Sequence, residues 1–164
     1  MGVGVILAQF YGAKENKKFK DATVTSSLFI GGVTLFIIII SLIGIDFILK
    51  AFNMPNELLT DAKSYLIIII LGLGFTFIYN LATALLRAIG DSKRPLYFLI
   101  IASIINVVLD IIFVLGFNLG VLGVAVATII AQGVSAIISI IYVYKKNRFY
   151  KNRKKRYKDK QIYI

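Results

Sequence analysis

Four apolar segments, each long enough to cross a bilayer as a helix, constrain this chain of 164 residues more than any other feature. They lie at about Thr23–Leu49, Ala62–Leu86, Pro95–Gly116 and Val124–Tyr144. A helix needs about 20 mostly apolar residues to span roughly 30 Å of hydrocarbon. Of all residues, 59% are hydrophobic, against about 45–50% in ordinary soluble domains. The sequence therefore predicts an all-α membrane protein with four transmembrane helices.

The basic residues lie almost entirely on one side of these segments. Four precede the first span, three lie between the second and third, and ten follow the fourth, whereas only Lys50 and Lys63 belong to the other side. Loops rich in Lys and Arg stay in the cytoplasm. We therefore expect a multi-pass protein of the plasma membrane, with the basic loops and the carboxy-terminal tail in the cytoplasm.

The remaining segments divide the chain into four parts. Residues 1–10 are apolar but too short to span, and we interpret them as the end of a partial helix. Residues 11–22 form a cytoplasmic loop, 23–144 the four-helix membrane region and 145–164 a basic tail. A basic tail beside a membrane helix favours contact with anionic lipid. Nucleic acid is not expected as a partner, because no nucleic-acid-binding motif accompanies the charge.

Several kinds of chemistry are excluded by composition. The chain has no Cys and no His, which removes thiolate and imidazole catalysis and the usual metal ligands of both types. The sequence also lacks the phosphate-binding GxxxxGK[ST] and nucleophile GxSxG patterns. We therefore expect neither enzyme activity nor a cofactor, and no metal beyond a transported Na⁺.

Asp110 is the strongest candidate for a functional residue. It lies about 22 Å along the third span from Pro95, at 1.5 Å per residue, and so inside the membrane. Intramembrane carboxylates are costly and mark functional sites. Asn106 precedes it by four residues and shares its helix face. The pair could bind a hard cation such as Na⁺ through its oxygen atoms, or the carboxylate could take up a proton. Alternatively, the two side chains could serve only to hold neighbouring helices together by hydrogen bonds.

Three further polar residues lie at depths from which they could line the same region. Thr128, near the outer end of the fourth span, could reach Asp110 in an antiparallel neighbour. Tyr65 lies near the outer end of the second span, and Asn80 lies in its middle. For each of them, hydrogen bonding that merely holds helices together is an open alternative.

Three longer runs of the sequence resemble consecutive parts of one known family of membrane proteins. Residues 8–19 (AQFYGAKENKKF) resemble the end of the family's second helix and the loop after it. Residues 85–97 (LLRAIGDSKRPLY), with Tyr65 and Gly72 before them, resemble the fourth helix and its exit. Residues 106–132 (NVVLDIIFVLGFNLGVLGVAVATIIAQ) resemble the fifth helix, a tight turn and the sixth helix. The resemblance extends, in order, to about Tyr144, and the family that these runs resemble is that of the multidrug and toxic compound extrusion (MATE) transporters.

This resemblance implies part of one lobe of a twelve-helix antiporter that exports organic cations and amphipathic compounds, driven by Na⁺ or H⁺. It implies a cation site at Asn106, Asp110 and Thr128, with Tyr65 and Asn80 lining the cavity. The family's first helix, most of its second and its whole second lobe have no counterpart in this sequence. We therefore expect a partial transporter that is inactive alone and whose partners include the rest of the transporter.

Two alternatives stay open at this stage. A lipid-linked saccharide flippase of the same superfamily would need Lys or Arg within its cavity, and the spans contain none in their interiors. A small membrane protein that does not transport, with a tail that binds lipid or a partner, would depend on the tail and not on Asp110.

Overall fold

The computed structural model describes the backbone of residues 2–53 and 55–161 and the side chains of residues 2–53 and 55–146. Within these ranges the chain is helical, in the order α1 (Gly2–Gly12), α2 (Asn16–Ile43), α3 (Ile45–Ala51), the 3-10 turn η1 (Asn56–Leu58), α4 (Leu59–Ala88), α5 (Lys93–Ile111), the π-helical turn η2 (Ile112–Gly116) and α6 (Gly120–Gln161).

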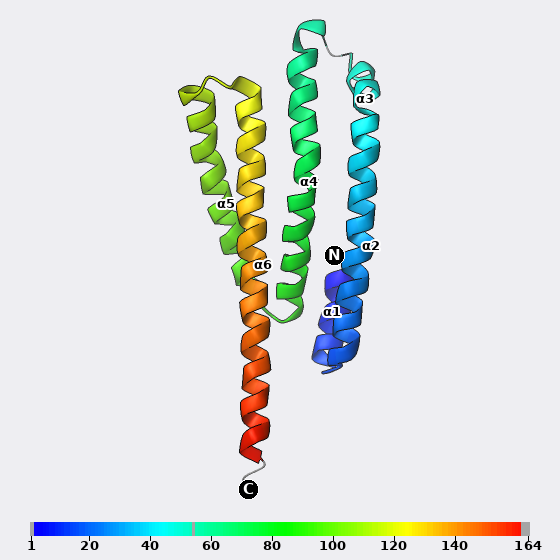
Figure 1. Ribbon diagram of the computed structural model, residues 1–164, viewed down its shortest axis with the longest axis vertical. Coiled ribbons are helices and arrows are strands. Elements are labelled where there is room, and N and C mark those ends of the chain that lie inside the picture. Colours follow the sequence, from blue (N-terminus) through cyan, green and yellow to red (C-terminus); the bar gives the residue numbers. More distant parts are fainter. Residues whose placement is uncertain (1, 54, 162–164) are drawn as a thin grey trace.

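Four helical stretches are long and apolar enough to span a membrane: Asn16–Ile43, Asn56–Ala88, Lys93–Gly116 and Gly120–Lys146. They lie side by side and run alternately up and down, and α1 packs beside α2 and α4 near one end of the bundle (Figure 1). The prediction of four membrane helices is therefore confirmed.

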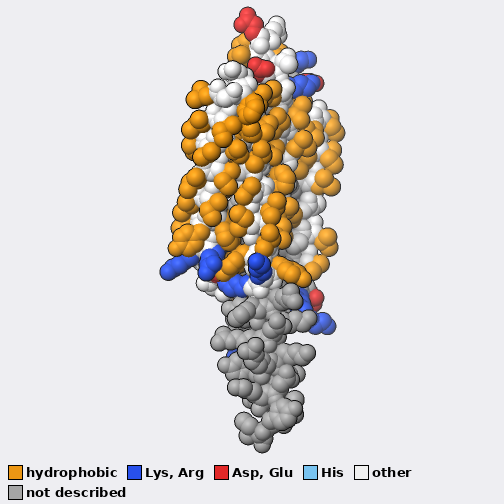
Figure 2. Space-filling view, turned by 60° about the vertical axis from the view of Figure 1, so that its left-hand side comes forward, with side chains coloured by type: hydrophobic (Ala, Val, Ile, Leu, Met, Phe, Trp, Pro, Cys, Tyr) orange, Lys and Arg blue, Asp and Glu red, His pale blue; other side chains and the backbone are white. Residues whose placement is uncertain are grey.

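On the face that Figure 2 shows, apolar side chains cover the middle of the bundle, and Lys and Arg side chains gather mainly below them. We call this lower end, which bears the α1–α2 connection, the α4–α5 turn and Lys146, the basic end. The α2–α4 and α5–α6 connections lie at the opposite end (Figure 1). The described structure thus shows the charge asymmetry that the sequence predicts.

Helix boundaries differ from the predicted spans at several points. The first span was expected to reach Leu49, but α2 ends at Ile43 and the chain bends at Gly44. Ile45 and Leu49 of α3 are buried against Ile70 of α4, while Asp46 and Lys50 stay exposed. The predicted first span is therefore divided at Gly44 into two helices, and the apolar face of the second one, α3, packs against α4.

The two expected polar segments also carry helix. Helix α2 begins at Asn16, within the loop expected over residues 11–22. Helix α6 continues without a break to Gln161, beyond the expected end of the fourth span at Tyr144. The side chains of the basic tail after Lys146 lie outside the described residues, and the expected contact with lipid therefore stays a prediction.

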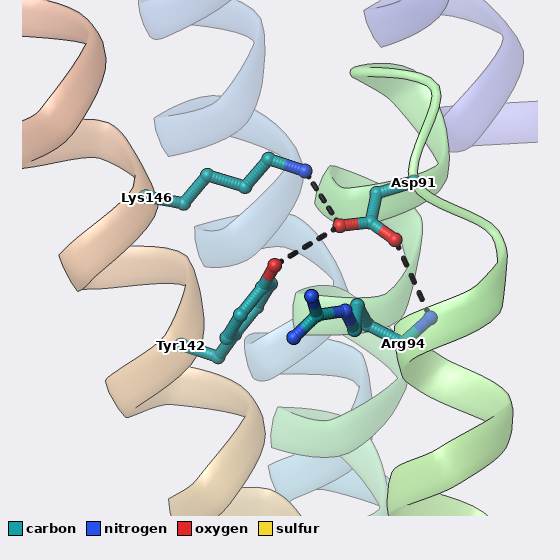
Figure 3. A network of polar contacts seen from close by, with 4 residues as sticks. All are labelled: Asp91, Arg94, Tyr142 and Lys146. Atoms are coloured by element: carbon teal, nitrogen blue, oxygen red, sulfur yellow. Dashed lines mark hydrogen bonds and ion pairs between the residues drawn. The ribbon is translucent and has the colours of Figure 1, made fainter.

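A polar cluster joins the α4–α5 turn to α6 at the basic end (Figure 3). Gly90 ends helix α4 at φ +82°, a conformation that other residues rarely adopt, and Asp91 follows it. Lys146 Nζ lies 2.6 Å from Asp91 Oδ2, and the Tyr142 hydroxyl donates to the same oxygen at 3.3 Å. The backbone N–H of Arg94 donates to Asp91 Oδ1 at 3.3 Å. We call these four residues, Asp91, Arg94, Tyr142 and Lys146, the α6 clasp.

Asp91, Tyr142 and Lys146 of the α6 clasp are partly buried, whereas Arg94 is exposed. The Asp91 and Lys146 side chains are 15% and 19% exposed, and the Arg94 guanidinium lies over the Tyr142 ring at 5.0 Å. Burial alone would raise the pKa of Asp91. The hydrogen bond from Lys146, the Arg94 N–H, the lysine charge and the Tyr142 hydroxyl outweigh burial and hold this pKa below its ordinary value of 3.8.

A second ion pair of the same length serves as a matched comparison. Asp46 and Lys63 also approach to 2.6 Å, but their side chains are 61% and 42% exposed. We expect Asp91→Ala to lower the free energy of unfolding by about 1.5–3 kcal/mol, the value of hydrogen bonds to a buried charge. Asp46→Ala should cost about 0–1 kcal/mol. Unfolding of the detergent-solubilised chain, followed by circular dichroism, measures both; equal losses would contradict a special role for the α6 clasp.

The lowered pKa of Asp91 also predicts a pH dependence. A carboxylate whose pKa is lower in the folded state stabilises the protein fully above its unfolded pKa, and this contribution disappears as the pH falls through the folded pKa. The stability difference between the native chain and Asp91→Asn should therefore stay constant from pH 7 to about 5 and shrink below about 3.8. A difference that shrinks already between pH 7 and 5 would show that another group is responsible.

Candidate functional site

The candidate site begins on the face of α5 that is turned toward α6. Asn106 and Asp110 lie one helical turn apart and are both half-buried, whereas Val107 and Val108 between them are exposed. The helix continues directly into the π-helical turn η2 at Ile112. Such turns are rare and frequently lie at functional sites. Both polar side chains are therefore partly buried in the bundle, and they lie just before the π-helical turn of the third span.

A hydrogen bond joins this face of α5 to α6. Asn106 Nδ2 donates to Thr128 Oγ1 at 3.4 Å, and the Thr128 hydroxyl donates to the Val124 carbonyl at 2.9 Å. The structure thus brings together two of the three residues predicted to form the cation site. The Asn106 amide oxygen and one lone pair of Thr128 are not used by these bonds. Two neutral oxygen ligands therefore remain available at this point.

Asp110 supplies the charge. Its Oδ1 atom is buried and finds no hydrogen-bond partner among the residues that the structure describes. An unpaired carboxylate is costly in a medium of low dielectric constant unless it takes up a proton or an ion. Carboxylate, amide and hydroxyl oxygens are the kinds of ligand that hard cations prefer.

The other two predicted residues do not join this group. Tyr65 is half-buried near the beginning of α4, and Asn80 is exposed farther along the same helix. The structure shows no hydrogen bond from either side chain to Asn106, Asp110 or Thr128. The proposed lining of a cavity by Tyr65 and Asn80 therefore stays a prediction.

Two polar residues that the sequence analysis did not single out bond across the bundle. The Thr76 hydroxyl of α4 donates to Gln132 Oε1 of α6 at 2.9 Å. Gln132 follows Thr128 by four residues and so shares its helix face. Gln132 could have been identified from the sequence, because it is an amide within an apolar span and lies four residues after Thr128. Its partner on α4 is apparent only once the two helices are placed side by side.

The comparisons with known proteins agree on one family. A sequence model of the MatE family matches residues 1–112. Over 100 residues, 61% of this chain, the sequence is 37% identical to the probable multidrug resistance protein YpnP of Bacillus subtilis (strain 168), 22% of whose length is covered. Over 151 residues, 88% of this chain, it is 32% identical to the probable multidrug resistance protein YoeA of the same organism, with 32% of that protein covered.

Solved structures show the same fold. The chain matches the inward-facing conformation of a multidrug resistance MATE family transporter of the MOP superfamily with a TM-score of 0.81 at 25% identity, covering 86% of this chain and 32% of that chain. It matches the outward-facing conformation of such a transporter with a TM-score of 0.81 at 25% identity, covering 89% and 32%. The chain thus spans about a third of the length of these structures.

The unpaired oxygen of Asp110 predicts an unusual response to mutation. Asp110→Asn removes a buried charge while keeping the side chain's shape. In buffer at pH 7 with choline as the only added cation, we expect the variant to be as stable as the native chain or more stable by about 1 kcal/mol. Asp21→Asn, at an exposed position of α2, is the control and should change stability by less than about 0.5 kcal/mol. A clear loss in Asp110→Asn alone would reveal a structural partner for the carboxylate.

Proposed function

Because the chain belongs to the MatE family, we propose that it acts as part of a multidrug efflux transporter in which Asp110 binds the coupling cation. The chain spans about a third of the length of its relative YoeA, and the activity of the whole transporter is therefore part of this proposal. The observation that carries it is the buried, unpaired Oδ1 of Asp110 beside the Asn106–Thr128 pair.

In this proposal each of the three residues has a distinct role. Asp110 takes up Na⁺ or H⁺, and Asn106 and Thr128 contribute neutral oxygens. A monovalent ion neutralises the one carboxylate and replaces its hydration shell with these oxygens. A proton instead neutralises Asp110 directly. Either ligand removes the cost of the buried charge, and the occupied site is therefore the more stable state of the protein.

Alternating access then requires movement of this unit against another. The chain matches an inward-facing and an outward-facing structure with the same TM-score of 0.81. This equality supports a unit that keeps its internal shape while the transporter changes state. Transporters commonly work by such rocking of one helical bundle against its partner. Cation binding at Asp110 would favour one of the two arrangements and so couple ion entry to export.

The proposal also includes orientation and substrates. The basic end, with the α4–α5 turn and the tail, faces the cytoplasm of a plasma membrane, and the exported compounds are amphipathic or cationic. The naming of both relatives as multidrug resistance proteins favours this function over a saccharide flippase. It also favours transport over a purely lipid-binding role for the tail.

Cation binding is tested on the chain itself. A ligand that binds only the folded state raises stability by RT ln(1 + [L]/Kd). In lipid nanodiscs, Na⁺ should raise the thermal midpoint of the native chain above that in choline, or acidification to about pH 5 should do so if the ligand is a proton. Asp110→Asn should lose this response, and Asp46→Asn should keep it. A native chain that responds to neither ion would refute cation binding at Asp110.

Transport is tested in two arrangements. Proteoliposomes containing only this chain should show no Na⁺- or pH-driven flux of ethidium, because alternating access needs a second moving unit. A hybrid in which the chain replaces the matching third of YoeA should export ethidium, and its Asp110→Asn form should not. Coupled export that is unchanged by Asp110→Asn would contradict the assigned role.

A further inference from the structure

The contact between Thr76 and Gln132 ties α4 to α6 inside the membrane region. The Thr76 hydroxyl donates to Gln132 Oε1 at 2.9 Å, and it also lies 3.4 Å from the carbonyl of Gly72 on its own helix. Both side chains are half-buried. A polar bond between helices in hydrocarbon has few competing partners and fixes how the two helices face each other. The rotation of α6 about its axis is therefore set in part by this bond.

Gly72 brings the two helices together at the same point. The residue is buried, and a Cβ atom there would lie 2.9 Å from Ile129 Cγ1 and 3.3 Å from Gln132 Oε1. A side chain at position 72 would therefore force Ile129, or the part of α6 that carries it, to shift. By contrast, a Cβ at Gly74 would meet no atom within 4 Å. Close packing at Gly72 and the bond at Thr76 thus hold the same turn of α6.

That turn of α6 is adjacent to the candidate cation site. Gln132 lies one helical turn from Thr128, on the same face, and Thr128 accepts the hydrogen bond of Asn106 at 3.4 Å. This length is near the upper limit for a hydrogen bond. A side-chain oxygen lies about 5 Å from its helix axis, and a rotation of about 10° would therefore move it by roughly 0.9 Å. Such a rotation would break the contact with Asn106.

We propose that Thr76 and Gln132 are a positioning pair that sets the cation affinity of the Asp110 site without contacting the cation. They hold α6 at the rotation in which the Thr128 oxygen faces Asn106, and Gly72 permits the close approach that their bond requires. The inference rests on the proposed cation binding at Asp110. It assigns a role in that binding to α4, which contributes none of the three proposed ligands.

The decisive comparison is Thr76→Val against Thr76→Ser. Valine keeps the shape but removes the hydroxyl, whereas serine keeps the hydroxyl. The readout is the Na⁺ concentration that gives half of the maximal thermal shift of the full chain in nanodiscs. Loss of one hydrogen bond changes affinity by about threefold to tenfold. We expect that increase for Thr76→Val, with the maximal shift retained, and less than a twofold change for Thr76→Ser.

If the bound ligand is a proton, the same effect appears as a pH shift. Weaker binding by threefold to tenfold lowers the midpoint pH of the stabilisation by about half a unit to one unit. Thr34→Val is the matched control, because among the residues that the structure describes the Thr34 hydroxyl bonds only to the Ile30 carbonyl of its own helix α2. A purely structural role of Thr76 would lower the thermal midpoint and leave the half-saturating concentration or pH unchanged. That result would overturn the proposal.

A second pair of variants removes no polar group. Gly72→Ala should push α6 away and weaken cation binding to a similar extent, whereas Gly74→Ala, where space is open, should leave it unchanged. This pair decides the question if Thr76→Val does not fold. If Gly72→Ala binds the cation as tightly as the native chain while Asp110→Asn shows no thermal shift with the cation, the role of Thr76 and Gln132 is refuted but the cation site at Asp110 is not. Absence of any cation response in the native chain would refute the proposed function and this inference with it.

Discussion

One face of α6 makes the polar contacts on which the arrangement of the other helices depends. Thr128 bonds to α5, Gln132 bonds to α4, and Tyr142 and Lys146 both bond to Asp91 in the α4–α5 turn. Within a membrane, apolar helix faces gain little by exchanging lipid for protein. Polar bonds and close packing must therefore choose which faces of the helices meet. Because these contacts share one side of a continuous helix, α6 sets the positions of both neighbours.

Two carboxylates of the bundle differ in how completely their oxygens are hydrogen-bonded. At the basic end, Asp91 has three donors and its pKa is held low. Toward the opposite end, Asp110 carries an oxygen that finds no partner among the described residues. One carboxylate thus stabilises the fold, while the other, in the proposed function, is a cost that the bound cation relieves. Functional sites commonly retain such local costs, which the rest of the structure compensates.

Sequence reasoning succeeded for the quantities that depend on composition and spacing. Hydropathy located the four spans because lipid requires about 20 apolar residues in a row. The four-residue spacing placed Asn106 and Asp110 on one face, and depth suggested Thr128 as their neighbour. It did not predict the interruption at Gly44, after which Ile45 and Leu49 of α3 are buried against Ile70 of α4. It also counted Lys146 only as a charge, since its pairing with Asp91 joins residues 55 positions apart.

By itself, the sequence determined the number of membrane helices, the side on which the positive charge lies and the presence of one costly acid within the third span. These follow from the solvent that each segment requires and need no knowledge of neighbouring helices. Tertiary structure alone decided that Thr76 meets Gln132, that Asp91 binds α6 and that Asp110 keeps a buried oxygen without a described partner. Such outcomes depend on the rotation and depth of one helix against another, which close packing around Gly72 fixes and which local sequence does not encode.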